Sequence, residues 1–108
     1  VLLTRPDGAI VAANRSACAM FGMSEQALMR AGLAGLADAG DPRLGALVRA
    51  RKRAGVASGE LRMLRAGNQA FEAEISSMVF DVANEAQGVD QLAGIFVRDI
   101  TVRQEAQR

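Results

Sequence analysis

Two acidic side chains, Glu72 and Glu74, are the first residues to weigh for chemistry, because paired carboxylates can act as general acid and base. The alternation of apolar and polar residues around them predicts a strand with both glutamates on one face and Phe71 and Ile75 on the other. Glutamates placed in this way are ordinarily solvated. The chain has no histidine, which removes the usual general base, the commonest metal ligand and the commonest haem ligand together. We therefore predict no catalytic residues, no metal site and no histidine-ligated haem.

Three other groups of residues could bind or react, and each has an ordinary structural interpretation. Cys18 is the only cysteine, so it forms no internal disulfide, and a buried thiol is its simplest role. A glycine-rich stretch lacks the spacing and the preceding strand of a dinucleotide-binding loop; its glycines are Gly32, Gly35 and Gly40. A basic cluster fits the solvated end of a helix, with anion or nucleic-acid binding as the alternative; its members are Arg49, Arg51, Lys52 and Arg53.

Composition restricts the class of protein. A length of 108 residues predicts one domain with a modest core, and 50% hydrophobic residues predict a globular chain. The net charge of +1 is no electrostatic footprint for nucleic acid, and no apolar run has the length of a membrane span. A single cysteine fits a reducing compartment, so we expect a cytoplasmic protein. Because the chain begins with Val, we expect it to be a piece of a longer protein.

Turn and capping residues locate the elements of the first half. Pro6-Asp7-Gly8 is a strong turn signal between two apolar strands, and Asn14 and Ser24 are N-cap residues of two short helices. The predicted strands are 1–4 and 9–13, and the predicted helices are 15–21 and 25–30. Residues 31–40 predict a loop or one weak helical turn.

The strongest helix signal follows that segment. Asp41 is an N-cap residue, Pro42 suits the first helical position, and Gly55 ends the helix. Its apolar stripe is Leu44, Leu47 and Val48.

Strands dominate the second half. We expect strands at 59–65, 69–80 and 91–99, with a turn at Gly67-Asn68 and a polar loop at 81–90. Thr101 then caps a helix, because Gln104 can close a capping box with it. The element order β-β-α-α-α-β-β-β-α predicts an α+β fold, an antiparallel sheet with helices on one face.

Three stretches, in order and at the expected spacing, resemble the PAS domain, a sensory module of bacterial signalling proteins. The first comprises 7–14 (Asp-Gly-Ala-Ile-Val-Ala-Ala-Asn), Ala17, Phe21-Gly22 and Ser24. The second comprises 59–62 (Gly-Glu-Leu-Arg), Gly67 and 71–76 (Phe-Glu-Ala-Glu-Ile-Ser). The third is Arg98-Asp99-Ile100-Thr101. Each stretch alone is a weak signal, but together they are specific and cover nearly the whole chain.

The resemblance implies a five-stranded antiparallel sheet in the order 2-1-5-4-3, with helices forming a pocket against one face. It implies a sensor domain over residues 1–100, the start of a signalling helix over 101–108, and a homodimer. Asp99 would anchor the joint between strand and helix, and Thr101 would begin the output helix. A downstream effector domain would follow in the same chain, most often a histidine kinase or a diguanylate cyclase.

The same resemblance bears on ligands. Flavin-binding members carry an Asn-Cys-Arg-Phe-Leu motif, absent here, and a glutamine where this chain has Val97, so we expect no flavin–cysteine photochemistry. The implied pocket lies between the long helix and the sheet, where ordinary core packing is the simplest interpretation. Few phenylalanines and many alanines leave room for a small apolar or weakly polar ligand. The predicted lining is Leu28, Leu33, Leu36, Leu47, Val48, Met63, Phe71, Ile75, Ile95 and Val97.

The last strand is apolar on both faces, as in strands that are covered on both sides. By the flavin-site correspondence, the Val97 face looks toward the helices, so Leu92 and Phe96 lie on the outer face. We expect a second subunit or a flanking helix to cover them, unless they are isolated exposures. The leading hypothesis is a non-catalytic sensor that relays the state of a ligand or partner, and the alternative is a ligand-free dimerisation module.

Overall fold

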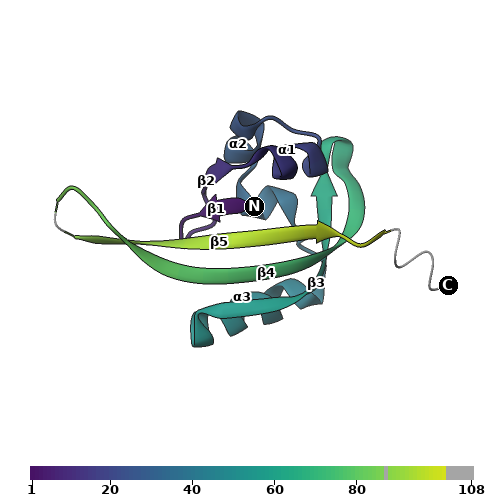
Figure 1. Cartoon of the computed structure of the whole chain (residues 1–108). Helices are drawn as coiled ribbons and strands as arrows, with labels where there is room; N and C mark the ends of the chain where they lie inside the picture. Colours follow the sequence, from purple (N-terminus) through teal and green to yellow (C-terminus); the bar gives the residue numbers. More distant parts are fainter. Residues whose placement is uncertain (87, 102–108) are drawn as a thin grey trace.

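The computed structural model describes residues 1–86 and 88–101, which form an antiparallel sheet with helices on one face (Figure 1). The sheet has five strands in the order β2-β1-β5-β4-β3, and every neighbouring pair is antiparallel, which confirms the predicted fold class. The elements are β1 (Leu2–Thr4), β2 (Ile10–Ala13), α1 (Arg15–Phe21), α2 (Glu25–Leu36), α3 (Pro42–Ala54), β3 (Val56–Arg65), a 3₁₀ turn η1 (Ala66–Asn68), β4 (Gln69–Ala83) and β5 (Val89–Asp99).

Local capping fixes α1 and α3 where the sequence predicts them. The Asn14 side chain accepts a hydrogen bond from the backbone N–H of Ala17 at 3.0 Å, and Gly22 ends α1 in the left-handed conformation. At α3, Asp41 caps the start and Gly55, with φ of 78°, ends the helix. Each helix therefore begins and ends at residues whose capping contacts lie within the helix and its immediate neighbours.

The second helix is kinked near the place where we expected it to end. We expected a helix to residue 30 with a loop or one weak turn after it, and α2 consists of two helical segments joined at Gly32, of which the second is a single turn ending at Leu36. Gly32 interrupts the helical conformation with φ of 67°, and the backbone N–H of Leu33 donates to the carbonyl of Gly8 at 2.9 Å. Leu36 is completely buried. Burial of this last turn against the sheet therefore holds a helix that its glycines alone disfavour.

The polar loop predicted at 81–90 is shorter than expected. β4 continues to Ala83 and β5 begins at Val89, so these strands form a long hairpin that extends away from the helices in Figure 1. The pairing of Asp81 with Gln91 is main-chain pairing, which side-chain polarity does not prevent. β3 likewise begins at Val56, earlier than expected, because Val56 pairs with Met78.

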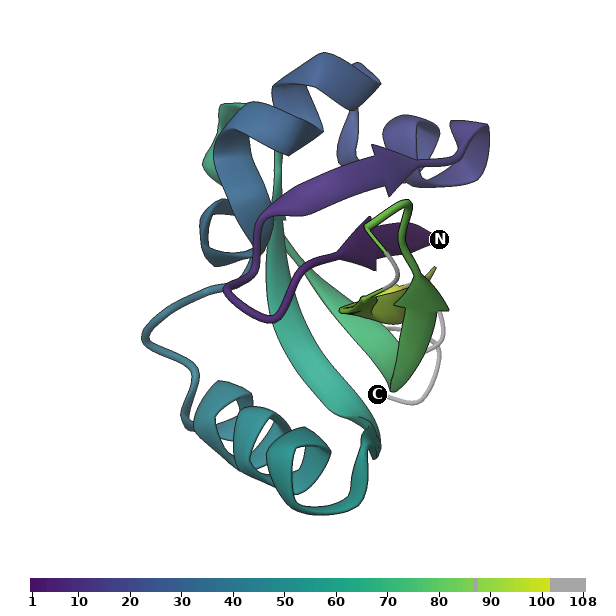
Figure 2. The same cartoon turned by 90° about the vertical axis from the view of Figure 1, so that its left-hand side faces the viewer.

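The core lies between the inner face of the sheet and the helices. Phe21 of α1 meets Phe71 of β4 edge to face, with ring centroids 5.6 Å apart. Leu2 and Leu28 are completely buried beside them. None of the residues of α3 is fully buried, and Figure 2 shows this helix standing apart from α1 and α2. The core is therefore tight near α1 and α2 and looser beneath α3.

Candidate functional site

A small cavity lies between α3 and the inner face of the sheet. Its volume is about 50 Å³, and most of its walls are aliphatic. Six of the residues predicted to line a pocket lie around it: Leu33, Leu47, Val48, Met63, Ile75 and Ile95. These residues come from α2, α3, β3, β4 and β5, so the cavity is a junction of the elements that make the fold.

The other four predicted residues do not line this cavity. Leu28, Leu36 and Phe71 are buried in the hydrophobic core, and Val97 packs against that core. This cavity lies at the part of the inner face that α3 covers, whereas these four residues pack in the core near α1 and α2. The sequence pattern identifies inward-facing residues, but it does not tell which of them border unfilled space.

Six further residues line the cavity that the sequence analysis did not place there: Ala37, Leu44, Arg51, Ala57, Leu61 and Ser77. Leu44 had already been assigned to the apolar stripe of the same helix. Ala37 and Ala57 border the cavity because their small side chains leave space unfilled, and a pattern of apolar residues does not predict that space. Arg51 had been assigned to a solvated helix end, whereas the structure places it at the cavity wall.

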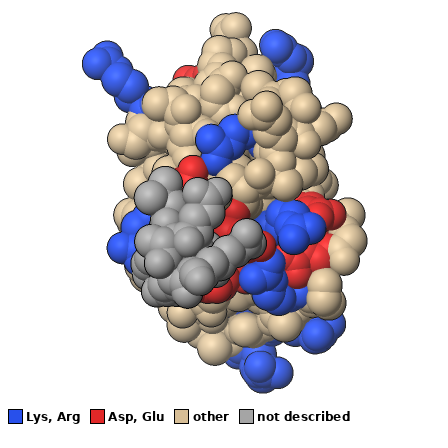
Figure 3. All heavy atoms as spheres, turned by 90° about the vertical axis from the view of Figure 1, so that its right-hand side faces the viewer, with Lys and Arg blue, Asp and Glu red and all other residues tan. Residues whose placement is uncertain are grey.

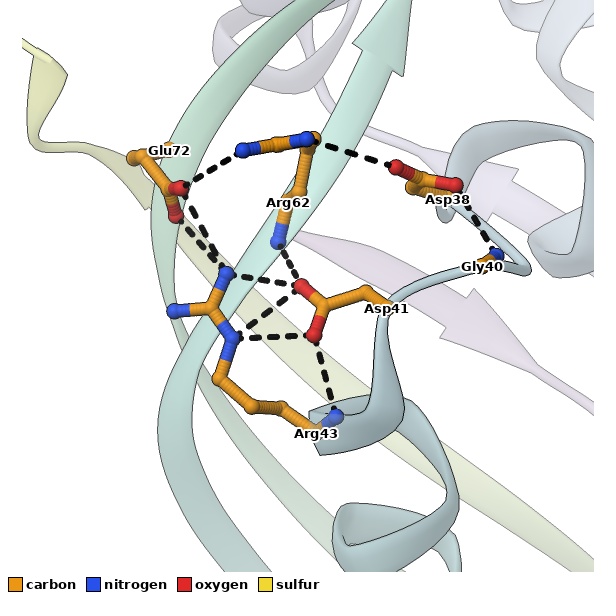
Figure 4. A network of polar contacts seen from close by, with 6 residues as sticks. All are labelled: Asp38, Gly40, Asp41, Arg43, Arg62 and Glu72. Carbon is orange, nitrogen blue, oxygen red and sulfur yellow. Dashed lines mark hydrogen bonds and ion pairs between the residues drawn. The ribbon is translucent and has the colours of Figure 1, made fainter.

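A polar network anchors the start of α3 to the sheet (Figure 4). The carboxylate of Asp41, only 6% exposed, accepts hydrogen bonds from the Nη2 of Arg43 at 2.7 Å and from the backbone N–H of Arg62 at 2.9 Å. It also accepts the backbone N–H of Arg43, which is the N-cap bond of the helix. Asp41 therefore holds the start of the helix against β3. The sequence predicted its capping bond to α3 but not its bond to β3.

Glu72 of β4 joins this network to the end of β5. Its carboxylate lies 3.1 Å from Arg43 Nη2 and 3.9 Å from Arg62 Nη2. Its backbone carbonyl accepts a hydrogen bond from the N–H of Ile100 at 3.0 Å, and its backbone N–H donates to Thr101 Oγ1 at 3.2 Å. One residue therefore contacts both the start of α3 and the residues that follow the sheet.

Asp99 holds the same end of β5 from a second direction. Its Oδ1 accepts the backbone N–H of Thr101 at 2.9 Å, and its Oδ2 accepts Arg65 Nη2 at 2.8 Å. The guanidinium of Arg65 also lies 4.0 Å from the ring centre of Phe71, so this cation is stacked as well as paired. Acidic and basic side chains lie against one another on this end of the molecule (Figure 3).

These contacts favour the charged forms of two aspartates. The hydrogen bond from Arg43, followed by that from the backbone of Arg62, holds the pKa of Asp41 well below its ordinary value. The hydrogen bond to Asp41 in turn raises the pKa of Arg43. Burial pushes the pKa of Asp99 upward, but the hydrogen bonds from Thr101 and Arg65 outweigh it and leave that pKa below its ordinary value.

A family model for the PAS domain matches residues 1–102, which is nearly the whole chain. The chain belongs to the PAS domain family. The PAS domain itself is a non-catalytic sensory module, so the cavity and the polar network belong to a domain that senses.

Solved PAS structures share the fold. The PAS domain of a Colwellia psychrerythraea protein is 24% identical, with a TM-score of 0.75 over 94% of this chain and 86% of that one. A PAS domain from a two-component sensor histidine kinase is 14% identical, with a TM-score of 0.69 over 91% of this chain and 81% of that one. At these identities the likeness establishes the fold alone.

An RNA-binding Light-Oxygen-Voltage receptor is also similar, at 22% identity with a TM-score of 0.71. The match covers 98% of this chain and 31% of that receptor, so this PAS domain spans about a third of its length. No curated protein matches the chain. In this PAS domain Cys18 lies in α1 and packs against the core, away from the residues that line the cavity. The absence of flavin–cysteine photochemistry stays a prediction.

The outer face of this PAS domain carries the predicted dimer residues. Phe96 is 53% exposed and Leu92 is half-buried, whereas Ala93 and Ile95 on the inner face are buried. Met78 and Val56 are paired across β3 and β4 and are about as exposed as Phe96, so the apolar surface extends across the sheet. Val56, Met78 and Phe96 line one open hollow on this face, so these three apolar side chains lie close together.

The described part of the chain, residues 1–86 and 88–101, contains neither a candidate metal site nor a candidate membrane-spanning helix. No group of three or more side chains of the metal-binding types lies close enough together there to hold a metal ion. Among those same residues, no helix is both long and apolar enough to cross a membrane. The predicted output helix at 101–108 falls, after Thr101, outside the described residues.

Proposed function

We propose that this PAS domain is the sensory and transducing part of a bacterial signalling protein of the histidine kinase or diguanylate cyclase type. In this proposal, a small molecule or partner alters the position of α3 over the cavity. The change passes through Glu72 to the Asp99–Thr101 junction and from there into a helix and an effector domain in the same chain. We further propose a cytoplasmic location, because Cys18, the single cysteine of this domain, fits a reducing compartment.

The position of Glu72 carries this proposal. Its carboxylate pairs with Arg43 in the first turn of α3, while its backbone hydrogen-bonds both residues that follow β5. Leu44, which follows Arg43 in sequence, lines the cavity. A displacement of α3 would therefore act directly on the groups that hold the junction. Such a relay requires a ligand that binds two arrangements of α3 with different affinity.

The test is a substitution at the junction of the full-length protein. We expect Asp99→Ala to change kinase or cyclase output, because it releases the Thr101 backbone and Arg65 together. Asp81→Ala, an exposed aspartate on β4, is the matched control and should leave output as in the parent. Thr101→Val, which removes only the hydroxyl that Glu72 contacts, should act in the same direction as Asp99→Ala. An Asp99→Ala protein that keeps the parent circular dichroism and the parent output would refute the relay.

A second candidate function rests on the apolar outer face of the sheet. Phe96, Met78 and Val56 are each more than half exposed, which is unusual for large apolar side chains so close together. Arg98 and Glu74 pair at 3.0 Å beside this area, so both signs of charge border it. A second copy related by a twofold axis would meet the same apolar area and opposite charges. A ligand-free dimerisation module would use this face alone.

A further inference from the structure

The hairpin of β4 and β5 extends beyond the rest of the sheet as a two-stranded arm, residues 80–83 and 89–92 (Figure 1). β1 pairs with β5 only as far as Ala93, and β3 pairs with β4 only as far as Met78, so among the described residues the arm has no strand on either side. The residues of the arm are exposed except Leu92, which is half-buried. Because a two-stranded hairpin is marginally stable by itself in water, such an arm indicates a partner.

One face of the arm is apolar and continues the outer face of the sheet. Phe80 and Val82 are 38% and 39% exposed, and they alternate with Met78 along β4, so the three side chains share that face. A Cβ added at Gly94 would lie 3.6 Å from Phe80 Cε1, which places the ring of Phe80 beside the residue that pairs with Met78. A partner that covers Met78 therefore meets the arm as well.

The arm is acidic. Residues 79–97 contain three acidic residues and no Lys or Arg; the acidic residues are Asp81, Glu85 and Asp90. Within the described residues, none of the three takes part in an ion pair. The arm therefore carries negative charge that this copy of the chain leaves without a cation.

The base of the arm lies beside the basic cluster of α3. A hollow of about 260 Å³ is lined by Arg51 and Lys52 of α3 together with residues at the base of the arm, among them Val79, Gln91 and Leu92. The four cations of the cluster likewise form no ion pair within the part of the chain that the structure describes. The hairpin is therefore acidic along its length and bordered by cations at its base.

Two such arms are complementary to each other when they run in opposite directions. About a twofold axis through the paired arms, the tip of each arm lies over the base of the other. The stretch from Met78 to Val82 spans about 13 Å of extended strand, so an axis near Phe80 sets Val82 of one copy over Met78 of the other. The acidic tip of each arm then approaches the basic cluster of the other copy.

We propose that a second copy of this chain is the partner of the arm. Phe80 and Val82 pack against the outer face of the other copy, and Glu85 pairs with Lys52 and Arg53 of its basic cluster. This inference rests on the dimerisation module proposed above and specifies how its two copies meet.

An exchange of charge between the two contact sites tests this arrangement. The arm variant is Glu85→Lys, the helix variant combines Lys52→Glu with Arg53→Glu, and all three residues are exposed. In a homodimer of either variant like charges meet at both contacts, so we expect self-association about tenfold weaker than that of the parent. In a mixed dimer opposite charges meet again at both contacts, so an equimolar mixture should associate within about twofold of the parent. Sedimentation equilibrium at constant ionic strength measures each association.

Two controls carry the same changes of charge at other places. Asp81→Lys reverses an exposed aspartate on the opposite face of the arm from Phe80 and Val82. Arg15→Glu combined with Arg30→Glu reverses two exposed cations of α1 and α2. Both controls should associate as the parent does.

The outcomes separate the arm contact from the dimerisation module. A mixture that associates no better than its separate variants, or controls that weaken association as much as the variants do, overturns the arm contact. If the charge exchange has no effect but Phe96→Glu dissociates the dimer, the module stands and the arm contact alone is wrong. A parent chain that does not associate refutes both.

Discussion

At the scale of single residues, Asp41 shows how one side chain serves both a helix and a sheet. Its cap on α3 is a contact over two positions of sequence, and the sequence predicted it. Its bond to the backbone N–H of Arg62 spans 21 positions and depends on how β3 passes the helix start. The anchor that Asp41 gives α3 is therefore partly local and partly a product of the fold.

The ionised form of Asp41 should make the stability of the domain sensitive to acid. Because the folded-state pKa lies below the ordinary value of 3.8, the carboxylate stabilises the fold above that value, and this stabilisation is lost as the pH falls toward the folded pKa. Asp41→Asn should lower the free energy of unfolding by about 1–3 kcal/mol at neutral pH, since it weakens charge-assisted hydrogen bonds. It should also flatten the decline that the parent shows as the pH falls from about 5 to about 2.

Urea unfolding at several pH values measures this effect. Asp81→Asn changes an exposed aspartate in the same way and should leave the parent decline unchanged. Asp99, whose pKa is also lowered, keeps part of the acid sensitivity in every variant. If Asp41→Asn loses stability toward acid as steeply as the parent, the charge of Asp41 does not anchor α3.

At the scale of elements, sequence reasoning succeeded where the signal was local. Asn14 with Gly22 and Asp41 with Gly55 gave both ends of α1 and α3, because capping depends on a few neighbouring residues. It underestimated the length of the β4–β5 hairpin, where main-chain pairing overrides composition.

The candidate site divides in the same way. Inward-facing positions such as Ile75 and Ile95 follow from alternation, and Asp99 and Thr101 from a resemblance in sequence. The network from Arg43 to Glu72 spans 29 positions and depends on the folded arrangement, so no short motif reveals it. Empty space beside Ala57 is likewise a property of the packing.

Gly45 within α3 and Gly55 immediately after it should respond oppositely to substitution by alanine. Gly55 has φ of 78°, and an added Cβ would meet nothing within 4 Å, so Gly55→Ala should destabilise the domain by about 1 kcal/mol through backbone strain alone. At Gly45, within the helix, an added Cβ would lie 3.2 Å from Arg49 Nη1, the mobile end of an exposed side chain. Gly45→Ala should therefore stabilise the helix by about 0.5–1 kcal/mol.

Denaturant midpoints of the two variants, measured beside the parent, check the pair. Each substitution adds one methyl group to the same element, so the two share their change in composition. A shift of the same sign in both would contradict the assignment of Gly55 as a left-handed helix end.

At the scale of the whole molecule, the sheet separates two surfaces of different composition. Its inner face holds the core and the cavity beneath α3, and its outer face carries the apolar area around Phe96 and Met78. β4 and β5 belong to both surfaces and to the junction with Ile100 and Thr101. A ligand on one face and a second copy on the other would therefore act on the same two strands.

The oligomeric state of the chain tests whether the outer face binds a second copy. We predict that the chain forms a dimer in solution and that Phe96→Glu shifts it to monomer, because a charge at the centre of an apolar contact is buried without a partner. Light scattering after size-exclusion chromatography gives the mass directly. Met29→Glu is the matched control, since Met29 is 44% exposed on α2 and lies away from the sheet's outer face. If the parent chain is monomeric across its soluble concentration range, or if Phe96→Glu remains a dimer, this face does not join two copies. The relay would then work within one chain.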